Sequence, residues 1–384
     1  MIPYGRQWID EEDKAAVLAV LESDWLTQGP AVPRFERSVA QFCGAVHGVA
    51  VANGTAALHL ACLALDVGPG DRVWTSPITF VASANCARYC GAQVDFIDID
   101  PETVNLSPTR LADRLVQARR DGCLPKVVIP VHFAGRCCDM DAIGALSEEF
   151  GFSVIEDASH ALGAKDAEAM VGACRRSAFA VTSFHPVKLV TTGEGGMLLT
   201  RDDRLAERCA LLRSHGITRD PSAMTGAPDG PWYYQQVELG YNYRMTDIQA
   251  ALGASQMTRL PGFLTRRREL VRRYRAALAH LPISLPRPDA DEASAWHLFV
   301  VRVAAERRRQ VFEALREAGI GVNVHYIPVH LQLDYARLGF RAGQFPAAEQ
   351  YYREAITLPL YPAMTDAQQD EVAASLERAL NAAS

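Results

Sequence analysis

Between Val73 and Glu156 the chain alternates short apolar runs with longer amphipathic segments. Short runs rich in Val and Ile are typical of buried strands, and segments with an apolar residue about every three or four positions are typical of helices. The predicted strands span residues 73–75, 94–99, 127–131 and 154–156, and the predicted helices span residues 80–89, 109–120 and 140–150. Strands that alternate with helices of about ten or more residues indicate a mostly parallel sheet with helices on both faces. The sequence therefore predicts an α/β fold.

Polar and aromatic residues follow several of the predicted strands. Thr55, Phe80, Asp157 and Ser183 each come just after an apolar run. In open α/β sheets, ligands bind beyond the carboxyl ends of the strands. We therefore expect these four residues to share one site.

The glycine turn after the predicted strand at residues 49–52 has the composition of an anion-binding helix start. An amphipathic run at residues 58–65 follows it. The free backbone N–H groups of a first helical turn at Gly54, Thr55 and Ala56, together with the Thr55 hydroxyl, suit a phosphate group. Asn-Gly-Thr is also an ordinary N-capping turn, so both interpretations stay open.

Lys188 is placed on a short turn between two apolar strands. The strands are predicted at residues 178–184 and 195–200, and the short connection between them predicts an antiparallel pair. A lysine amine can form a Schiff base with a carbonyl, and a pyridoxal phosphate enzyme needs such a lysine together with a carboxylate that keeps the pyridine nitrogen protonated. Lys188 and Asp157 supply both groups. The alternative for a lysine on a turn is a solvated side chain without a function.

The composition of the 384-residue chain excludes several kinds of partner. A net charge of −6 provides no basic surface for nucleic acid or for an anionic membrane. The uncharged stretches are shorter than about 18 residues, and the start of the chain lacks the apolar core of a signal peptide, so we expect a cytoplasmic protein without a membrane span. The cysteines show no CxxC spacing, so we expect no metal site and reduced thiols in the core.

The remainder of the chain predicts a second, smaller domain. Pro261-Gly262 marks the expected boundary between a large domain at residues 1–260 and a small α+β domain at residues 261–384. Residues 216–232 form a predicted loop, and a loop longer than about 12 to 15 residues is typical of a lid, a binding loop or a subunit contact. Further helices are predicted at residues 10–21, 35–42, 205–214, 248–255, 263–281, 307–318 and 366–380, and further strands at residues 298–303 and 322–324.

Five segments in the same order together resemble the DegT/DnrJ/EryC1/StrS family of pyridoxal-phosphate-dependent sugar aminotransferases. They are residues 53–58 (NGTAAL), 77–85 (PITFVASAN), 156–163 (EDASHALG), 183–196 (SFHPVKLVTTGEGG) and 240–245 (GYNYRM). The resemblance extends over essentially the whole chain. It implies the type I fold of pyridoxal phosphate enzymes and a homodimer in which the neighbouring chain completes each active site.

The resemblance also implies roles for individual residues. Lys188 matches the Schiff-base lysine, and Asp157 matches the partner of the pyridine nitrogen. The matching cofactor-binding residues are Gly54, Thr55, Ala56, Phe80, Asp157, His160, Ser183, Lys188 and Asn242, of which Thr55 and Ser183 bind the phosphate, Phe80 stacks on the ring, His160 lies near the ring oxygen and Asn242 reaches the phosphate of the partner chain. Tyr4, Trp25, Leu26, Thr27, His325 and Tyr326 match segments that bind the nucleotide sugar.

Several of these residues also have a structural interpretation. Phe80 is equally compatible with a helix core, and His160 with a helix position that has no ligand. Asn242 is compatible with an ordinary turn before a helix. His325 is compatible with a histidine whose hydrogen bonds are satisfied at the end of a strand.

The implied activity is the transfer of an amino group from glutamate to a nucleotide-linked keto sugar. Residues 159–160, 184–188 and 324–328 look most like the members that aminate C4 of a UDP-linked 4-keto-6-deoxy-N-acetylhexosamine in pseudaminic acid biosynthesis. The alternatives are a dTDP- or GDP-linked sugar aminated at C3 or C4, a pyridoxal-phosphate-dependent sugar dehydratase, and a non-catalytic regulator. Related dehydratases carry histidine in place of the Schiff-base lysine, so Lys188 argues against the dehydratase.

Overall fold

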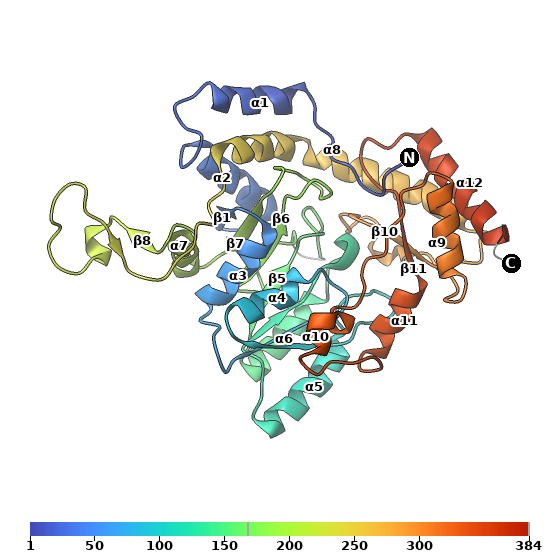
Figure 1. Ribbon diagram of the computed structural model, residues 1–384, viewed down its shortest axis with the longest axis horizontal. Helices are drawn as coiled ribbons and strands as arrows, with labels where there is room; N and C mark the ends of the chain where they lie inside the picture. The colour runs from blue at the N-terminus through green and yellow to red at the C-terminus, as the bar shows by residue number, and fades with distance from the viewer. Residues whose placement is uncertain (167–168, 383–384) are drawn as a thin grey trace.

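The computed structural model describes residues 1–166 and 169–382, and a seven-stranded sheet forms its centre (Figure 1). The strands lie in the order β1-β7-β6-β5-β4-β2-β3. They are β1 (His47–Val51), β2 (Arg72–Thr75), β3 (Gln93–Phe96), β4 (Val127–Ile129), β5 (Ser153–Asp157), β6 (Phe179–Ser183) and β7 (Gly196–Thr200). From β3 to β6 all neighbours are parallel, whereas β7 is antiparallel to both β6 and β1. The predicted parallel sheet and the antiparallel return strand are both confirmed.

Two groups of helices cover the two faces of this sheet. Successive side chains of a strand point to opposite faces, and β4 shows the consequence. Val127 and Ile129 pack with residues of α3 (Gly54–Ala64) and α4 (Ala82–Tyr89), whereas Val128 packs with α5 (Pro108–Asp121) and α6 (Met140–Phe150). α7 (Asp203–Leu212) also contributes to the first of these cores.

The longest helix, α8 (Asp247–Leu278), runs from beneath α1 to the smaller part of the chain (Figure 1). Two separate helices at 248–255 and 263–281 were expected on either side of Pro261, and this expectation is wrong. Proline removes one backbone hydrogen bond from a helix, but both halves of α8 are buried against tertiary partners. α1 (Glu11–Leu21) and α2 (Ala31–Cys43) pack on the first half, and the core of the smaller part of the chain packs on the second half. Tertiary packing therefore maintains the helix through the proline.

The smaller part of the chain is built around one antiparallel pair, β10 (Phe299–Arg302) with β11 (Ala355–Leu358). α9 (Arg308–Glu317) and α12 (Asp366–Ala382) share its core. The remaining elements here are α10 (Leu333–Ala336), α11 (Pro346–Glu354) and the short 3-10 helices η3 (Pro288–Ala290) and η4 (Val329–Leu331). The strand expected at residues 322–324 is reduced to a single bridge between Asn323 and Thr357. β11 and α11 were not predicted.

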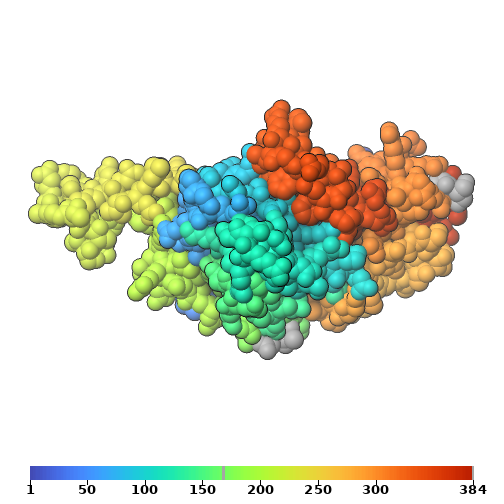
Figure 2. All heavy atoms as spheres, turned by 90° about the horizontal axis from the view of Figure 1, so that it is seen from below, coloured from blue at the N-terminus to red at the C-terminus, as the bar shows by residue number. Residues whose placement is uncertain are grey.

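A two-stranded hairpin projects from the body of the molecule. It consists of β8 (Ile217–Thr218) and β9 (Gln235–Gln236), with the 3-10 helix η2 (Pro221–Ala223) between them. Figures 1 and 2 both show this segment extending beyond the sheet and its helices. It covers most of the predicted loop at residues 216–232. Within the described part of the chain, no helix is both long and apolar enough to cross a membrane.

Candidate active site

A cleft of about 750 Å³ opens at the carboxyl ends of the central strands. Of the residues expected at a site, it is lined by Tyr4, Gly54, Thr55, Phe80, Asp157, His160, Ser183, Lys188, His325 and Tyr326. They come from both parts of the chain: β5, β6 and the start of α3 supply one wall, and residues 323–327 supply another. The structure thus brings together the four strand-end residues and most of the others.

The start of α3 forms an anion seat in this cleft. Asn53 caps the helix, since its Oδ1 accepts a hydrogen bond from the Ala56 N–H (2.8 Å). The N–H groups of Gly54 and Thr55 have no acceptor among the residues that the structure describes, and Thr55 lines the cleft. A Cβ on Gly54 would lie 3.1 Å from Ser183 Cβ, so glycine allows the helix start and β6 to approach closely. This arrangement fits a phosphate group held by two amides and two hydroxyls.

Asp157, the last residue of β5, is a buried carboxylate with a fixed orientation. The Ser83 hydroxyl donates to its Oδ2 (2.6 Å), and the Ser159 N–H donates to its Oδ1 (3.1 Å). Because the Ser83 hydroxyl donates to Asp157, it accepts a hydrogen bond from the Thr79 hydroxyl (2.7 Å). The carboxylate therefore presents a negative charge to the cleft at a fixed position, as binding of a protonated pyridine nitrogen requires.

Lys188 lies on the turn after β6, where its backbone N–H donates to the backbone carbonyl of His185 (2.8 Å). Its side chain lines the cleft, and the residue is half-buried. This burial lowers the pKa of the amine to about 8, and the negative charge of Asp157 offsets part of the decrease. A neutral amine is the nucleophile and the base in lysine chemistry, and the lower pKa makes this form more abundant near neutral pH.

A cluster of neutral histidines forms the wall of the cleft beside Tyr326. Burial and the nearby positive charge of Lys188 lower the pKa of His160 well below its ordinary value. The Ala134 N–H donates to His160 Nδ1 (3.4 Å), so the ring proton lies on Nε2, which is 3.0 Å from the Tyr326 hydroxyl. His160 lies in a turn, so the interpretation as a helix residue is wrong. His297, which was not expected at the site, also lines the cleft, with its ring centroid 4.4 Å from that of His160.

His325 lines the cleft and is hydrogen-bonded to β11. Its Nδ1 is 2.8 Å from the Thr357 hydroxyl. Burial, followed by the charge of Lys188, lowers its pKa to about 3. His325 therefore has a hydrogen-bond partner, as the structural interpretation expected, and it also forms part of the cleft wall.

Phe80 precedes α4 and is 59% exposed, so it does not belong to a helix core. Its ring lies 6.4 Å from that of Tyr326 on the same cleft. A large aromatic side chain exposed in a cleft has the surface that a planar ring needs for stacking.

Five of the expected residues do not line the cleft of the single chain. Ala56 is buried, with its N–H bonded to Asn53. Trp25 and Leu26 are about half exposed, and Thr27 pairs with Thr246. Asn242 is exposed on the segment that pairs with Ser214. The roles expected of these residues remain predictions.

One protein family matches almost the whole chain. The sequence profile of the DegT/DnrJ/EryC1/StrS aminotransferase family matches residues 7–377. The spore coat polysaccharide biosynthesis protein SpsC of Bacillus subtilis (strain 168) is 41% identical over 379 residues, which are 97% of this chain and 95% of SpsC.

Two solved structures are similar over almost their full length. PseC of Helicobacter pylori, an aminotransferase involved in the biosynthesis of pseudoaminic acid, superposes with a TM-score of 0.91 at 29% identity over 99% of each chain. Spr1654 of Streptococcus pneumoniae, assigned as a sugar aminotransferase, superposes in its PMP form with a TM-score of 0.91 at 30% identity over 100% of both chains. The same protein has been solved in a PLP form.

Proposed function

This chain belongs to the DegT/DnrJ/EryC1/StrS aminotransferase family and is a pyridoxal-phosphate-dependent sugar aminotransferase, and we propose that it transfers an amino group from glutamate to C4 of a UDP-linked 4-keto-6-deoxy-N-acetylhexosamine. The main support for this proposal is that Lys188, Asp157 and the anion seat of α3 line the same cleft. These groups match the aldehyde, the ring nitrogen and the phosphate of the cofactor.

Pyridoxal phosphate, when bound, supplies an electron sink for the negative charge that develops on a substrate carbon. Asp157 stabilises positive charge on the bound ring, and Ser83 and Ser159 keep its carboxylate in place. Phe80 would stack on the ring, and Thr55 and Ser183 would hold the phosphate. The chain thereby fixes the cofactor at three separated points, which restricts its orientation.

Lys188 is the group that moves the proton. Its pKa of about 8 leaves roughly one amine in ten neutral at pH 7, which is enough for a general base that is regenerated in each cycle. In the first half of the reaction, Nζ accepts the proton of the glutamate Cα. In the second half, Nζ delivers a proton to the sugar carbon that receives the nitrogen.

The sugar and its nucleotide occupy the part of the cleft beyond the cofactor. Tyr4, His325 and Tyr326 line this part. The assignment to C4 of a UDP-linked N-acetyl sugar is supported by the sequence similarity of residues 159–160, 184–188 and 324–328 to enzymes with that activity and by the likeness to PseC. SpsC, at 41% identity, is named for the synthesis of a surface polysaccharide, a process that consumes nucleotide sugars.

The proposed enzyme is a homodimer with shared active sites. Asn242 lies outside the cleft of its own chain and is exposed, as a residue that serves the partner would be. The projecting hairpin carries Trp232 and Tyr234, which are 69% and 51% exposed, and Leu239 follows it at 76% exposure. Such apolar side chains are suited to a protein interface. Within each chain we propose a large domain at residues 1–260 and a small domain at residues 261–384, with the boundary inside α8.

The substrate assignment is tested by competition between UDP-4-keto, UDP-3-keto, dTDP-4-keto and GDP-4-keto sugars, with the position of the new amine determined by NMR. We expect strong preference for the UDP-4-keto sugar, because a site that bonds the acetamido and hydroxyl groups leaves its own polar groups unpaired with an analogue, at about 1 to 3 kcal/mol for each buried group. Preference for a 3-keto, dTDP or GDP substrate would contradict the assignment and leave the aminotransferase activity unaffected.

A further inference from the structure

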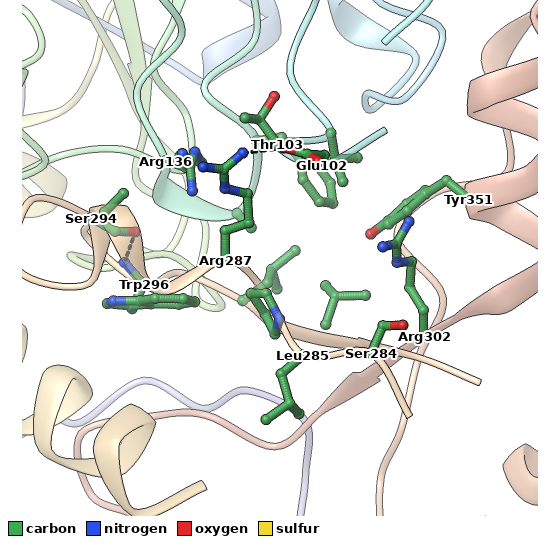
Figure 3. Close-up of a pocket in the computed structure, with 17 residues that line it drawn as sticks. Glu102, Thr103, Arg136, Ser284, Leu285, Arg287, Ser294, Trp296, Arg302 and Tyr351 are labelled. Atoms are coloured by element: carbon green, nitrogen blue, oxygen red, sulfur yellow. Dashed lines mark hydrogen bonds and ion pairs between the residues drawn. The ribbon is translucent and has the colours of Figure 1, made fainter. Parts of the chain in front are cut away.

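A second, smaller cavity of about 60 Å³ lies at the junction of the two parts of the chain, and Figure 3 shows the side chains that line it. Residues 102–104 and 133–136 form one side of it, and residues 284–302 with Tyr351 form the other. This volume exceeds the roughly 10 to 15 Å³ that a cavity needs to hold one water, so a small group can enter it. None of its residues belongs to the cofactor site described above.

The charges around this cavity leave one arginine without a carboxylate. Arg136 forms two 2.7 Å hydrogen bonds with Asp289, and Arg287 is paired with Glu102. Arg302, in contrast, has no carboxylate partner among the described residues, and it donates a hydrogen bond to the carbonyl of Pro101 (3.1 Å). A guanidinium of this kind is a strong, bidentate binding group for a carboxylate.

The remaining walls of the cavity are mostly apolar. Leu298, Val300 and Arg302 alternate along the chain into β10 and all line the cavity, as expected for side chains on one face of a strand. Phe133 and Trp296 complete the walls, and both are buried. A ligand that satisfies this lining has one carboxylate for Arg302 and a small apolar body for the rest.

The cavity shares walls with the active site. The Phe133 ring lies 6.1 Å from that of His160 and 6.3 Å from that of Tyr326. On the opposite side, the Tyr351 hydroxyl donates to the carbonyl of His325 (3.1 Å). Tyr351 and Arg302 both line the cavity. A ligand bound to Arg302 would therefore contact the supports of two segments of the cofactor cleft.

We propose that this cavity is a regulatory site for a short-chain carboxylate, which Arg302 binds and whose presence is transmitted to the active site through Phe133 and Tyr351. The site is separate from the one that receives glutamate and the sugar. Its occupant stabilises the junction between the two parts of the chain, because it contacts both.

The test uses butyrate as the charged probe and butyramide as its neutral analogue, with the cofactor-loaded enzyme. Ligand-observed saturation-transfer NMR measures binding, and the visible absorption of the bound cofactor reports the transmitted effect. We expect butyrate to bind, butyramide to give a signal at least about five times weaker, and the cofactor spectrum to change with butyrate. Butyrate binding should persist with saturating glutamate and nucleotide sugar.

Two variants locate the binding site. Arg302→Gln removes the charge, and Val300→Phe fills the cavity; each should weaken the butyrate signal at least about fivefold and abolish the spectral change. Arg309→Gln, which changes an arginine with an 87% exposed side chain on α9, is the matched control and should behave as the wild type. Retention of the cofactor absorption band shows that a variant has folded.

Several results would overturn the proposal. Equal binding of butyrate by the wild type and by either folded variant would remove Arg302 or the cavity from the site. Equal binding of butyramide would exclude recognition of the charge. Displacement of butyrate by glutamate would place the probe in the active site, and binding without a spectral change would refute the coupling.

Discussion

Replacing Lys188 with Met should stabilise the apoenzyme at pH 7. In the folded protein, burial lowers the pKa of this amine from 10.5 to about 8. One pKa unit corresponds to about 1.4 kcal/mol, so the protonated amine lowers the free energy of unfolding by up to about 3 kcal/mol. This value is an upper limit, because the open cleft lets water solvate part of the charge. Methionine has a similar length and no charge, so it avoids this penalty.

The advantage of the variant should depend on pH in a defined direction. Below pH 8 the amine is protonated in both the folded and the unfolded wild type, and the full penalty applies. Between pH 8 and 10.5 the folded state binds fewer protons than the unfolded state, so the wild type gains stability as the pH rises. At pH 10 only about 1 kcal/mol of the penalty remains, so the stability advantage of Lys188→Met over the wild type should decrease to about that value.

Urea denaturation of the apoenzymes at a fixed protein concentration measures this difference. The concentration must be fixed because the stability of a dimer depends on it. Lys14→Met is the matched control: Lys14 lies exposed on α1 with Glu11 as its partner, so its replacement should produce only a small change. A Lys188→Met protein that is no more stable than the wild type at pH 7, or whose advantage is the same at pH 7 and pH 10, would refute the proposed burial of the charged amine.

Three further predictions concern the groups around the site. Ser83→Ala should weaken pyridoxal phosphate binding about five- to a hundredfold in a fluorescence titration, because Asp157 loses a 2.6 Å hydrogen bond in a buried environment; unchanged affinity would exclude this role. Arg267→Met should lower the urea midpoint, since three buried backbone carbonyls lose their guanidinium donor; burial also lowers the pKa of this guanidinium to about 9, which offsets part of the loss, and an unchanged or higher midpoint would show that the burial penalty outweighs the three hydrogen bonds. Mixing the inactive variants Lys188→Ala and Asn242→Ala should restore activity as subunits exchange; full activity of Asn242→Ala alone, or no recovery despite exchange, would contradict the shared site.

Most of the large sheet could be predicted from the sequence because its signals are local. Most of its strands contain short apolar runs, and β1 to β4 and β7 are each followed by a helix with its own periodicity. In the smaller part of the chain, β10, α9 and α12 were also predicted, whereas β11 and α11 were not. β11 (Ala355–Leu358) is four residues long, and its partner β10 lies more than 50 residues earlier in the chain, so its pairing depends on contacts that no local pattern contains. The uninterrupted α8 was missed for the same reason, since burial of both halves outweighs the local effect of Pro261.

The site residues also divide into those that a local sequence pattern predicts and those that only long-range contacts bring to the site. Asp157 and Ser183 were predicted because they end apolar strands, and Lys188 because it follows one. Ser83 and His297 were missed, although Ser83 lies inside a recognised segment. Ser83 bonds Asp157 across 74 positions of the chain, and His297 packs on His160 from the other part of the molecule. A hydroxyl on a helix and a histidine before a strand give no sign of their partners until the fold brings the two together.

Burial keeps the histidines of the cleft neutral, and a neutral His160 carries a single ring proton whose position can be assigned. Burial lowers the pKa of His160, His297 and His325, so these rings stay neutral and act as oriented hydrogen-bond partners. Because His160 accepts the Ala134 N–H at Nδ1, its single proton lies on Nε2 and is donated to the Tyr326 oxygen. The tyrosine hydroxyl must then donate its own proton elsewhere, and its residue lines the cleft. The histidine next to the cofactor site thereby makes Tyr326 a donor toward bound ligands, although neither residue carries a charge.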